Sequence, residues 1–276
     1  MQNTSDEKLH RTPYGGATSG GLIDTHAHLA FEPLLSDIDN VLNRSIDAGV
    51  TAWITVGTDP EENRKSIALA EKYENLYAAL GIHPHYAKDV TADDLTQLER
   101  LANHEKVVAI GETGLDFHYN FSEQPAQKEL FRKHLALAAK LNLPVVIHSR
   151  EAFEDTVQVL EQHGGGIKKV VFHCFTGTAD QAKVILDKGW YISFTGVVTF
   201  KHTEHVREAA KLVPLERMML ETDCPYMTPA PMRKQKTNEP ALLVHTAKFL
   251  AELKGVSFET LTAKTTETSK EFFKLF

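Results

Sequence analysis

Two histidines lie one residue apart in the stretch GLIDTHAHLA, residues 21–30. This stretch reads as a strand, in which side chains two positions apart point to the same side. His26 and His28 then converge on one point, while Ala27 between them points away. Converging imidazoles are a common way to bind a metal ion. A solvated strand edge would show the same spacing, so this pair alone leaves both interpretations open.

The elements that position these histidines form a regular alternation of strands and helices. Eight short apolar runs lie at 21–27, 51–57, 76–82, 106–112, 144–149, 169–175, 190–196 and 217–223. Most are continuous rather than alternating, which is typical of parallel strands buried on both faces. Helical spacing appears at 61–73, 127–142, 153–163 and 179–189, and near 240–253 and 258–274. This α/β pattern predicts a single (β/α)8 TIM barrel with the last two helices packed outside, and a doubly wound open sheet is the alternative.

The composition is that of an ordinary globular protein. Of the 276 residues 42% are apolar and 24% charged, and the net charge of -7 argues against a broad basic surface for nucleic acid. A local basic groove stays possible. We expect residues 1–20 to be a flexible N-terminal extension and residues 21–276 to be the barrel. Two cysteines, Cys174 and Cys224, suit a cytoplasmic protein, and the sequence predicts neither a membrane segment nor an obligate protein partner.

Histidines and acids follow the predicted strands at their C-terminal ends, the face where barrel enzymes carry their chemistry. Because eight parallel strands converge there, we expect six side chains to meet around one point: His26, His28, Glu112, His148, His173 and Asp223. Other polar residues at these ends are Asp24, His83, His85, Asp116 and Glu221. Asp59, which precedes Pro60, has the simpler role of a helix N-cap. Four histidines with two carboxylates suit two divalent ions that share one carboxylate, as in a binuclear hydrolase.

Hydrolytic chemistry follows from such a centre. Two divalent ions lower the pKa of a shared water and polarise the substrate oxygen. Asp223 is the candidate base that takes the proton of this water. Arg150 lies two residues after His148 on the same side of the strand, and its planar guanidinium suits phosphate oxygens. A structural ion pair with a nearby acid is the alternative role for Arg150.

Six motifs carry a resemblance to a known family. DTHAHL, GIHPH, GETGLD, IHSR, FHCFTG and ETDCPY occur in this order on successive strands. Together they resemble the TatD family of metal-dependent deoxyribonucleases, within the amidohydrolase-like barrels. The resemblance implies that His26, His28 and Asp223 hold one ion, that His148 and His173 hold the second, and that Glu112 bridges both.

The resemblance also implies an activity and its cofactors. The expected reaction is hydrolysis of DNA phosphodiesters, with 3′-to-5′ exonuclease behaviour on single strands, in the cytoplasm and with Mg, Mn or Zn. The ligand set itself also accepts Fe and Ni. The subgroup with GLDFHY places His83, His118 and Tyr119 around the ions as supporting or substrate contacts. Hydrogen-bonded loop residues are the alternative for these three.

One loop departs from the family pattern, and two other functions stay open. After strand eight the family often has P-x-R-G-K-x-N-x-P, whereas this chain reads PAPMRKQKTNEP, with Lys234 where glycine is usual. Lysine resists backbone conformations that glycine permits, so the path of this loop is open. An amidohydrolase-type enzyme acting on a small C–N or ester substrate is the alternative. Glu112, in place of a bridging lysine, favours the nuclease. A metal-binding protein without catalysis is the third possibility.

Overall fold

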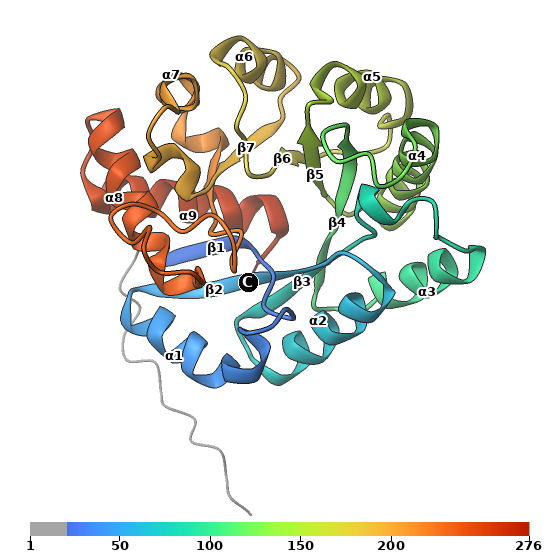
Figure 1. Cartoon of the computed structure of the whole chain (residues 1–276), viewed down its shortest axis with the longest axis horizontal. Coiled ribbons are helices and arrows are strands. Elements are labelled where there is room, and N and C mark those ends of the chain that lie inside the picture. The colour runs from blue at the N-terminus through green and yellow to red at the C-terminus, as the bar shows by residue number, and fades with distance from the viewer. Residues whose placement is uncertain (1–20, 276) are drawn as a thin grey trace, which may run out of the picture.

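Eight parallel strands form one sheet in the computed structural model, which describes residues 21–275. They follow one another in sequence order around the ring seen in Figure 1. Their bounds are β1 (Leu22–Ala27), β2 (Val50–Gly57), β3 (Leu76–Leu80), β4 (Val107–Asp116), β5 (Val145–Arg150), β6 (Val170–Phe172), β7 (Tyr191–Phe194) and β8 (Met218–Leu220). The fold is therefore the predicted (β/α)8 barrel. The expected extension, residues 1–20, lies outside the described residues.

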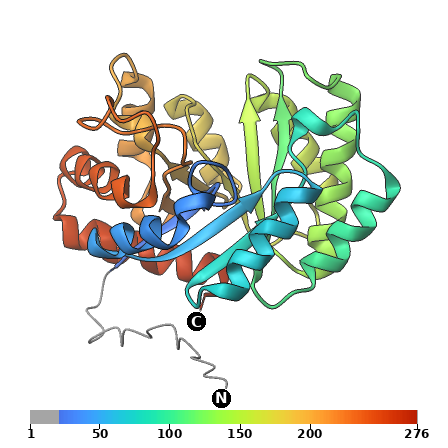
Figure 2. The same cartoon turned by 60° about the horizontal axis from the view of Figure 1, so that its bottom comes forward.

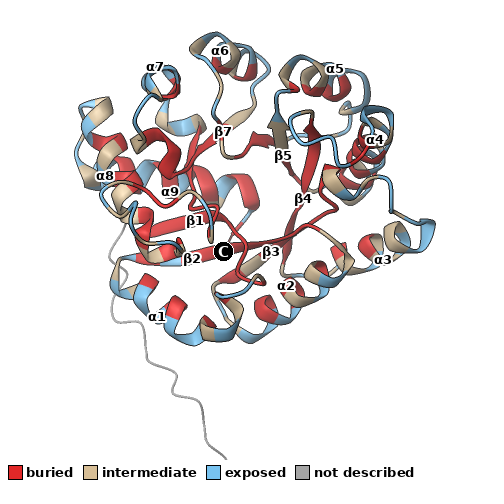
Figure 3. Cartoon of the chain, in the orientation of Figure 1, coloured by how far each residue is buried: buried red, intermediate tan, exposed pale blue. Residues whose placement is uncertain are grey.

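Helices surround the strands and turn their buried faces inward, as Figure 3 shows. They are α1 (Ile38–Asp47), α2 (Pro60–Lys72), α3 (Ala92–Ala102), α4 (Gln124–Leu141), α5 (Phe153–His163), α6 (Ala179–Asp187), α7 (Glu204–Leu212), α8 (Leu243–Lys254) and α9 (Phe258–Phe273). The predicted cap at Asp59 is confirmed, because its carboxylate accepts hydrogen bonds from the backbone N–H groups of Glu61 and Glu62. No helix in the described part of the chain is long and apolar enough to span a membrane.

Hydrogen bonds just beyond β8 and β1 close the barrel. The backbone N–H of Asp223 donates to the carbonyl of His26 at 2.9 Å, and the N–H of His28 donates to the carbonyl of Cys224 at 2.9 Å. Thr222 adds a backbone and a hydroxyl hydrogen bond to the buried carboxylate of Asp24. These contacts join the first and last strands, which an open doubly wound sheet would leave at separate edges.

The core has an outer and an inner part. The larger cluster lies between strands and helices, whereas a smaller one gathers alternate strand residues such as Ile54 and Val56 inside the ring. Phe272, Phe273 and Leu275 belong to this inner cluster. Figure 2 accordingly shows the C-terminus at the lower end of the barrel. The expectation that the last helix packs only outside was therefore wrong for its end, which closes the barrel interior on the side away from the histidine-rich strand ends.

Candidate metal centre

The six side chains expected to meet do come together at the C-terminal ends of the strands. His26, Glu112 and His148 lie within β1, β4 and β5, respectively. His28 and His173 come directly after β1 and β6, and Asp223 lies three residues after the end of β8. Their donor atoms form two groups, in each of which the atoms lie within 4.8 Å of one another. The first group is His26, His28 and Asp223, and the second is Glu112, His148 and His173.

Glu112 lies between the two groups and presents one oxygen to each. Its Oε1 is 2.7 Å from His148 Nδ1 and 2.8 Å from His173 Nε2. Its Oε2 faces the other group, 3.5 Å from His26 Nε2 and 3.8 Å from His28 Nε2. This division of the two oxygens is the geometry that a shared carboxylate requires.

The donor atoms of the first group converge on one small region. His26 Nε2 and His28 Nε2 face each other at 3.4 Å, and Asp223 Oδ1 lies 3.3 Å from His28 Nε2 and 3.8 Å from His26 Nε2. Two imidazole nitrogens and a carboxylate oxygen that converge in a buried site are a donor set for a divalent cation. The residues present therefore fit the metal that the motif predicts.

Burial and neighbouring charges shape the protonation of these groups. Burial opposes the charge of Glu112, but the charges of His173 and His83 and the hydrogen bond from His148 outweigh it and hold its pKa well below the usual range. Burial likewise opposes the charge of Asp223, yet the hydrogen bond and charge of His28 lower the pKa of this carboxyl. Both carboxylates are thus ionised at neutral pH. Buried, ionised carboxylates need compensating positive charge, which the histidines supply when they are protonated and which a bound cation would supply when the imidazoles are neutral ligands.

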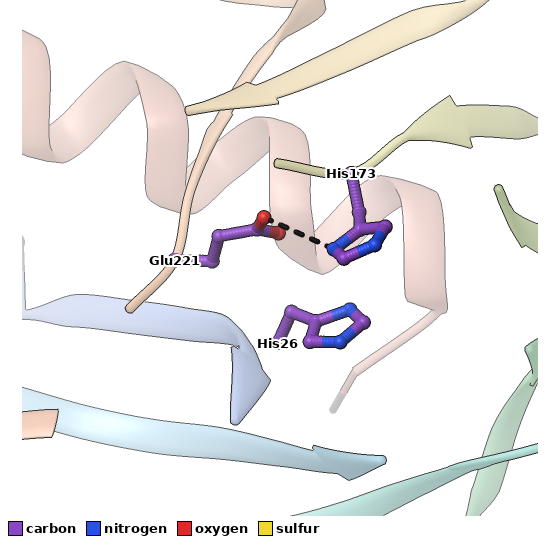
Figure 4. A group of neighbouring side chains, drawn as sticks. All are labelled: His26, His173 and Glu221. Atoms are coloured by element: carbon purple, nitrogen blue, oxygen red, sulfur yellow. Dashed lines mark ion pairs between the residues drawn. The ribbon is translucent and has the colours of Figure 1, made fainter. Parts of the chain in front are cut away.

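Two further carboxylates lie behind the histidines of the second group. Asp116 Oδ2 is 3.0 Å from His148 Nε2, on the ring edge opposite to the nitrogen that faces Glu112. Glu221 Oε1 is 3.4 Å from His173 Nδ1, and Figure 4 marks this ion pair with a dashed line. His173 Nε2 faces Glu112. The carboxylate of Asp116 keeps the proton on Nε2 of His148 and leaves Nδ1 free to bind a metal, whereas Nδ1 of His173 makes no hydrogen bond within residues 21–275 and has Glu221 only as a charged neighbour.

The packing of the rings fixes the geometry further. The rings of His26 and His173 stack with centroids 3.9 Å apart and an angle of 11° between their planes, an arrangement visible in Figure 4.

The sequence analysis located Asp116 and Glu221 at strand ends but assigned them no role. Their position at a strand end was the only signal in the sequence. Asp24 has the same kind of position, but its carboxylate accepts hydrogen bonds from Thr222 between β1 and β8 instead.

The predicted substrate contacts divide into one buried residue and a group on the rim. His83 is buried, and its Nε2 lies 3.6 Å from Glu112 Oε1, so it belongs to the centre itself. His118 and Tyr119 lie on the loop after β4, where His118 Nδ1 is 2.7 Å from Glu151 Oε1 and Tyr119 is 47% exposed. The guanidinium of Arg150 lies over the Tyr119 ring, 4.6 Å from its centroid.

Arg150 is therefore held by a ring rather than by an acid. Among residues 21–275 no carboxylate forms an ion pair with Arg150, so the alternative role of a structural ion pair finds no partner here. A guanidinium stacked on a ring keeps its N–H donors available. This arginine is exposed, whereas the candidate ligands are buried or, in the case of His148, partly buried.

The loop after β8 has Lys234 where the family usually has glycine, and the side chain of Asn238 holds this loop in place. The side-chain amide of Asn238 donates to the carbonyls of Thr222 and Tyr226, and its backbone N–H donates to Pro225. Arg233 lies over the ring of Phe200, 3.9 Å from its centroid. The loop path is thus held by Asn238 from within, and Lys234 is simply exposed.

Comparison with known proteins agrees with this architecture. A sequence profile described as TatD related DNase matches residues 23–274. The uncharacterized metal-dependent hydrolase YabD of Bacillus subtilis is 42% identical over 254 residues, which cover 92% of this chain and 99% of that protein. A protein of Pantoea ananatis named 3′-5′ ssDNA/RNA exonuclease TatD is 38% identical, over 92% of this chain and all of its own length.

Solved structures show the same relationship. The TatD homologue YjjV of Escherichia coli superposes with a TM-score of 0.87 at 31% identity, covering 92% of this chain and 98% of its own. A TatD family hydrolase of Entamoeba histolytica superposes with a TM-score of 0.85 at 28% identity, with the same coverage. With its strand-end motifs, its barrel and its clustered histidines and carboxylates, the chain belongs to the TatD family of metal-dependent hydrolases.

Proposed function

We propose that this hydrolase removes nucleotides from the 3′ end of single-stranded DNA, with two divalent ions per chain. His26, His28 and Asp223 would hold one ion, and His148 and His173 the other, with Glu112 shared. The ions would be Zn, Mn, Mg or Ni. When bound, they supply a water of lowered pKa and an electrophilic environment for a phosphoryl oxygen.

Asp223 is the residue we assign to the proton of that water. Its carboxyl pKa is lowered by the hydrogen bond and charge of His28 despite burial, so that it is ionised and able to accept. Its Oδ1 lies at the edge of the first donor group, 3.3 Å from His28 Nε2. A carboxylate in this place accepts a proton from a nucleophile without moving.

The observation that supports a nucleic-acid substrate is the distribution of exposed aromatic rings. Among residues 21–275, six large hydrophobic side chains are exposed, and the four aromatic ones come from loops at the metal-centre face: Tyr86, Tyr119, Phe121 and Tyr226. Tyr119 and Phe121 are parallel, with centroids 5.4 Å apart and 1° between planes. Unpaired bases stack on such rings, whereas bases inside a duplex are covered by their neighbours.

Arg150 adds a phosphate-binding group to these rings. Its guanidinium is exposed above Tyr119 and on the strand that carries His148, so it can contact the backbone of a strand that stacks on the rim. The name of the Pantoea relative, 3′-5′ ssDNA/RNA exonuclease, supports the same substrate class and includes RNA in it. Free thiols at Cys174 and Cys224 support our proposal of a reducing cytoplasmic environment.

The test uses 3′-labelled and 5′-labelled single-stranded DNA with Mg or Mn, and again with EDTA. We expect metal-dependent loss of the 3′ label first, followed by stepwise shortening of the 5′-labelled strand. Arg150→Ala should raise KM with little change in kcat, whereas Arg132→Ala, which removes a partly exposed arginine that pairs with Glu129 on α4, should change neither. A protein that contains two ions and cleaves no phosphodiester would refute the proposed substrate.

A further inference from the structure

A cavity of about 340 Å³ opens beside the metal centre, between the loops that follow β5 and β6. It shares His173 with the second donor group, so its contents adjoin any phosphate held there. The first turns of α5 and α6 complete its walls, through Phe153, Glu154 and Gln181. This volume falls in the range of small-molecule sites and suits one nucleoside rather than a longer stretch of chain.

The lining of this cavity favours a flat, neutral group. The lining includes the half-buried ring of Phe153 together with Phe172 and Phe175, which are almost fully buried, and Phe153 and Phe172 lie with ring centroids 6.0 Å apart. The lining includes Glu151 and Glu154 but neither lysine nor arginine. A phosphate would meet these negative charges without a permanent cation to balance them, whereas a neutral aromatic ring would not.

The cavity also offers hydrogen-bonding groups of both kinds. Helix α5 begins at Phe153 without a side-chain cap, so its first backbone N–H groups remain donors on this wall. The Oε1 of Gln181 accepts from the N–H of Thr178, which leaves the amino end of this amide as a donor. Glu151 and Glu154 are acceptors for amino and hydroxyl groups. Nucleosides carry donors and acceptors of this kind around a flat ring.

From these features we infer that the cavity binds the nucleoside of the 3′-terminal nucleotide, the one that the reaction releases. The inference rests on the proposed function. In the step it serves, the water oxygen bonds to phosphorus, and the bond from phosphorus to the O3′ of the preceding nucleotide breaks. That O3′ takes up a proton, and a nucleoside 5′-monophosphate remains with its base in the cavity and its phosphate at the donor groups.

Thr176→Trp tests this assignment, because Thr176 is exposed at the wall of the cavity and an indole there fills the space. The hydrogen bond from His205 Nε2 to Thr176 uses the backbone carbonyl, so the substitution keeps it. The matched control is Thr96→Trp, an exposed position of α3 that does not line the cavity. The substrates are two DNA strands that differ only in whether the 3′-terminal residue carries a base or is abasic.

For the unaltered protein and Thr96→Trp, we expect kcat/KM to be about tenfold higher for the strand with a terminal base, a ratio typical of one stacked base. In Thr176→Trp this ratio should fall to about one, mainly by loss of rate on the normal strand. A ratio of one in the unaltered protein, or a tenfold ratio that survives in Thr176→Trp, would overturn the assignment.

Binding of deoxyadenosine monophosphate, measured by calorimetry on the metal-loaded protein, separates this inference from the proposed activity. We expect binding that Thr96→Trp retains and Thr176→Trp weakens at least tenfold. If the protein cleaves no DNA yet shows this pattern, the activity is refuted and the nucleoside site stands. If it cleaves DNA but Thr176→Trp binds the nucleotide as the unaltered protein does, the activity stands and the nucleoside site is refuted.

Discussion

Asp116→Asn should weaken one metal site and leave the other in place. Asp116 Oδ2 is 3.0 Å from His148 Nε2 and 2.9 Å from His85 Nε2, and its Oδ1 accepts from the backbone N–H groups of His118 and Tyr119. Asparagine keeps an oxygen for these N–H groups but turns an amide NH2 toward His148. The ring then loses the acceptor that holds its proton on Nε2 and leaves Nδ1 for the ion.

The size of this effect follows from the bond that is lost. A hydrogen bond to a charged group contributes about 1.5–3 kcal/mol. At 1.4 kcal/mol for each tenfold change in an equilibrium constant, this loss weakens binding of the second ion by about 10- to 150-fold. The first group, His26, His28 and Asp223, makes no contact with Asp116 and should keep its affinity.

The assay is a titration of metal-free protein with Zn or Mn against a chromophoric chelator, in which two binding steps are resolved. We expect the unaltered protein and Asp94→Asn, a remote exchange in the N-terminal cap of α3, to give the same two steps. In Asp116→Asn only one of the two binding steps, the one that belongs to the second group, should shift to weaker affinity. Unchanged affinity in both steps, or an equal loss in both, would refute the assigned role of Asp116.

Three other predictions follow from the same geometry. Glu112→Ala should reduce bound metal at both sites and abolish activity, because each group loses an oxygen; full metal content by elemental analysis would contradict this. Asp223→Asn should lower kcat at least 100-fold while the melting temperature of the apoprotein changes little, and full activity would remove Asp223 from catalysis. Burial raises the pKa of Asp24 from 3.8 to about 7 despite its bonds to Thr222, so the folded state holds a proton that the unfolded state releases. The protonated Asp24 therefore stabilises the folded state fully below about pH 4. As the pH rises to about 7 the free energy of unfolding falls by roughly 4 kcal/mol, at 1.36 kcal/mol per pH unit. In Asp24→Asn the free energy of unfolding of the metal-free protein, measured by urea denaturation, should fall less between pH 4 and pH 7. The same fall with pH as in the unaltered protein would contradict the raised pKa of Asp24.

The barrel and the candidate ligands were predictable because both depend on strand periodicity. Continuous apolar runs gave eight strands, and parallel strands bring their C-terminal residues to one face, so His26, Glu112 and Asp223 had to approach one another. Helices α1, α3 and α7 lay in stretches for which we made no prediction. Their buried residues nevertheless have helical spacing, as Ile38, Val41 and Leu42 of α1 do, so these helices were readable from the sequence and were missed.

Features that depend on side-chain direction were not predictable. The position of Asp116 four residues after Glu112 does not reveal that its carboxylate reaches His148 from the opposite ring edge. Arg150 was expected to bind phosphate or an acid, and the structure shows a ring beneath it because the loop after β4 folds back over β5. The cavity beside His173 joins two loops that share no sequence signal.

The seam between the first and last strands also determines when this protein acquires its reactivity. His26 and Asp223 are joined by a backbone hydrogen bond, and both contribute to the first donor group, although they lie about 200 positions apart. A nascent chain emerging from the ribosome therefore has two of the three members of this donor group, His26 and His28, early in synthesis, and gains Asp223 only when almost the whole barrel has been made. An incomplete chain has no assembled hydrolytic centre. In the finished protein an ion held by the proposed ligands His26, His28 and Asp223 would act as a cross-link between the two ends of the sheet, so that loss of the ion and opening of the seam would favour each other.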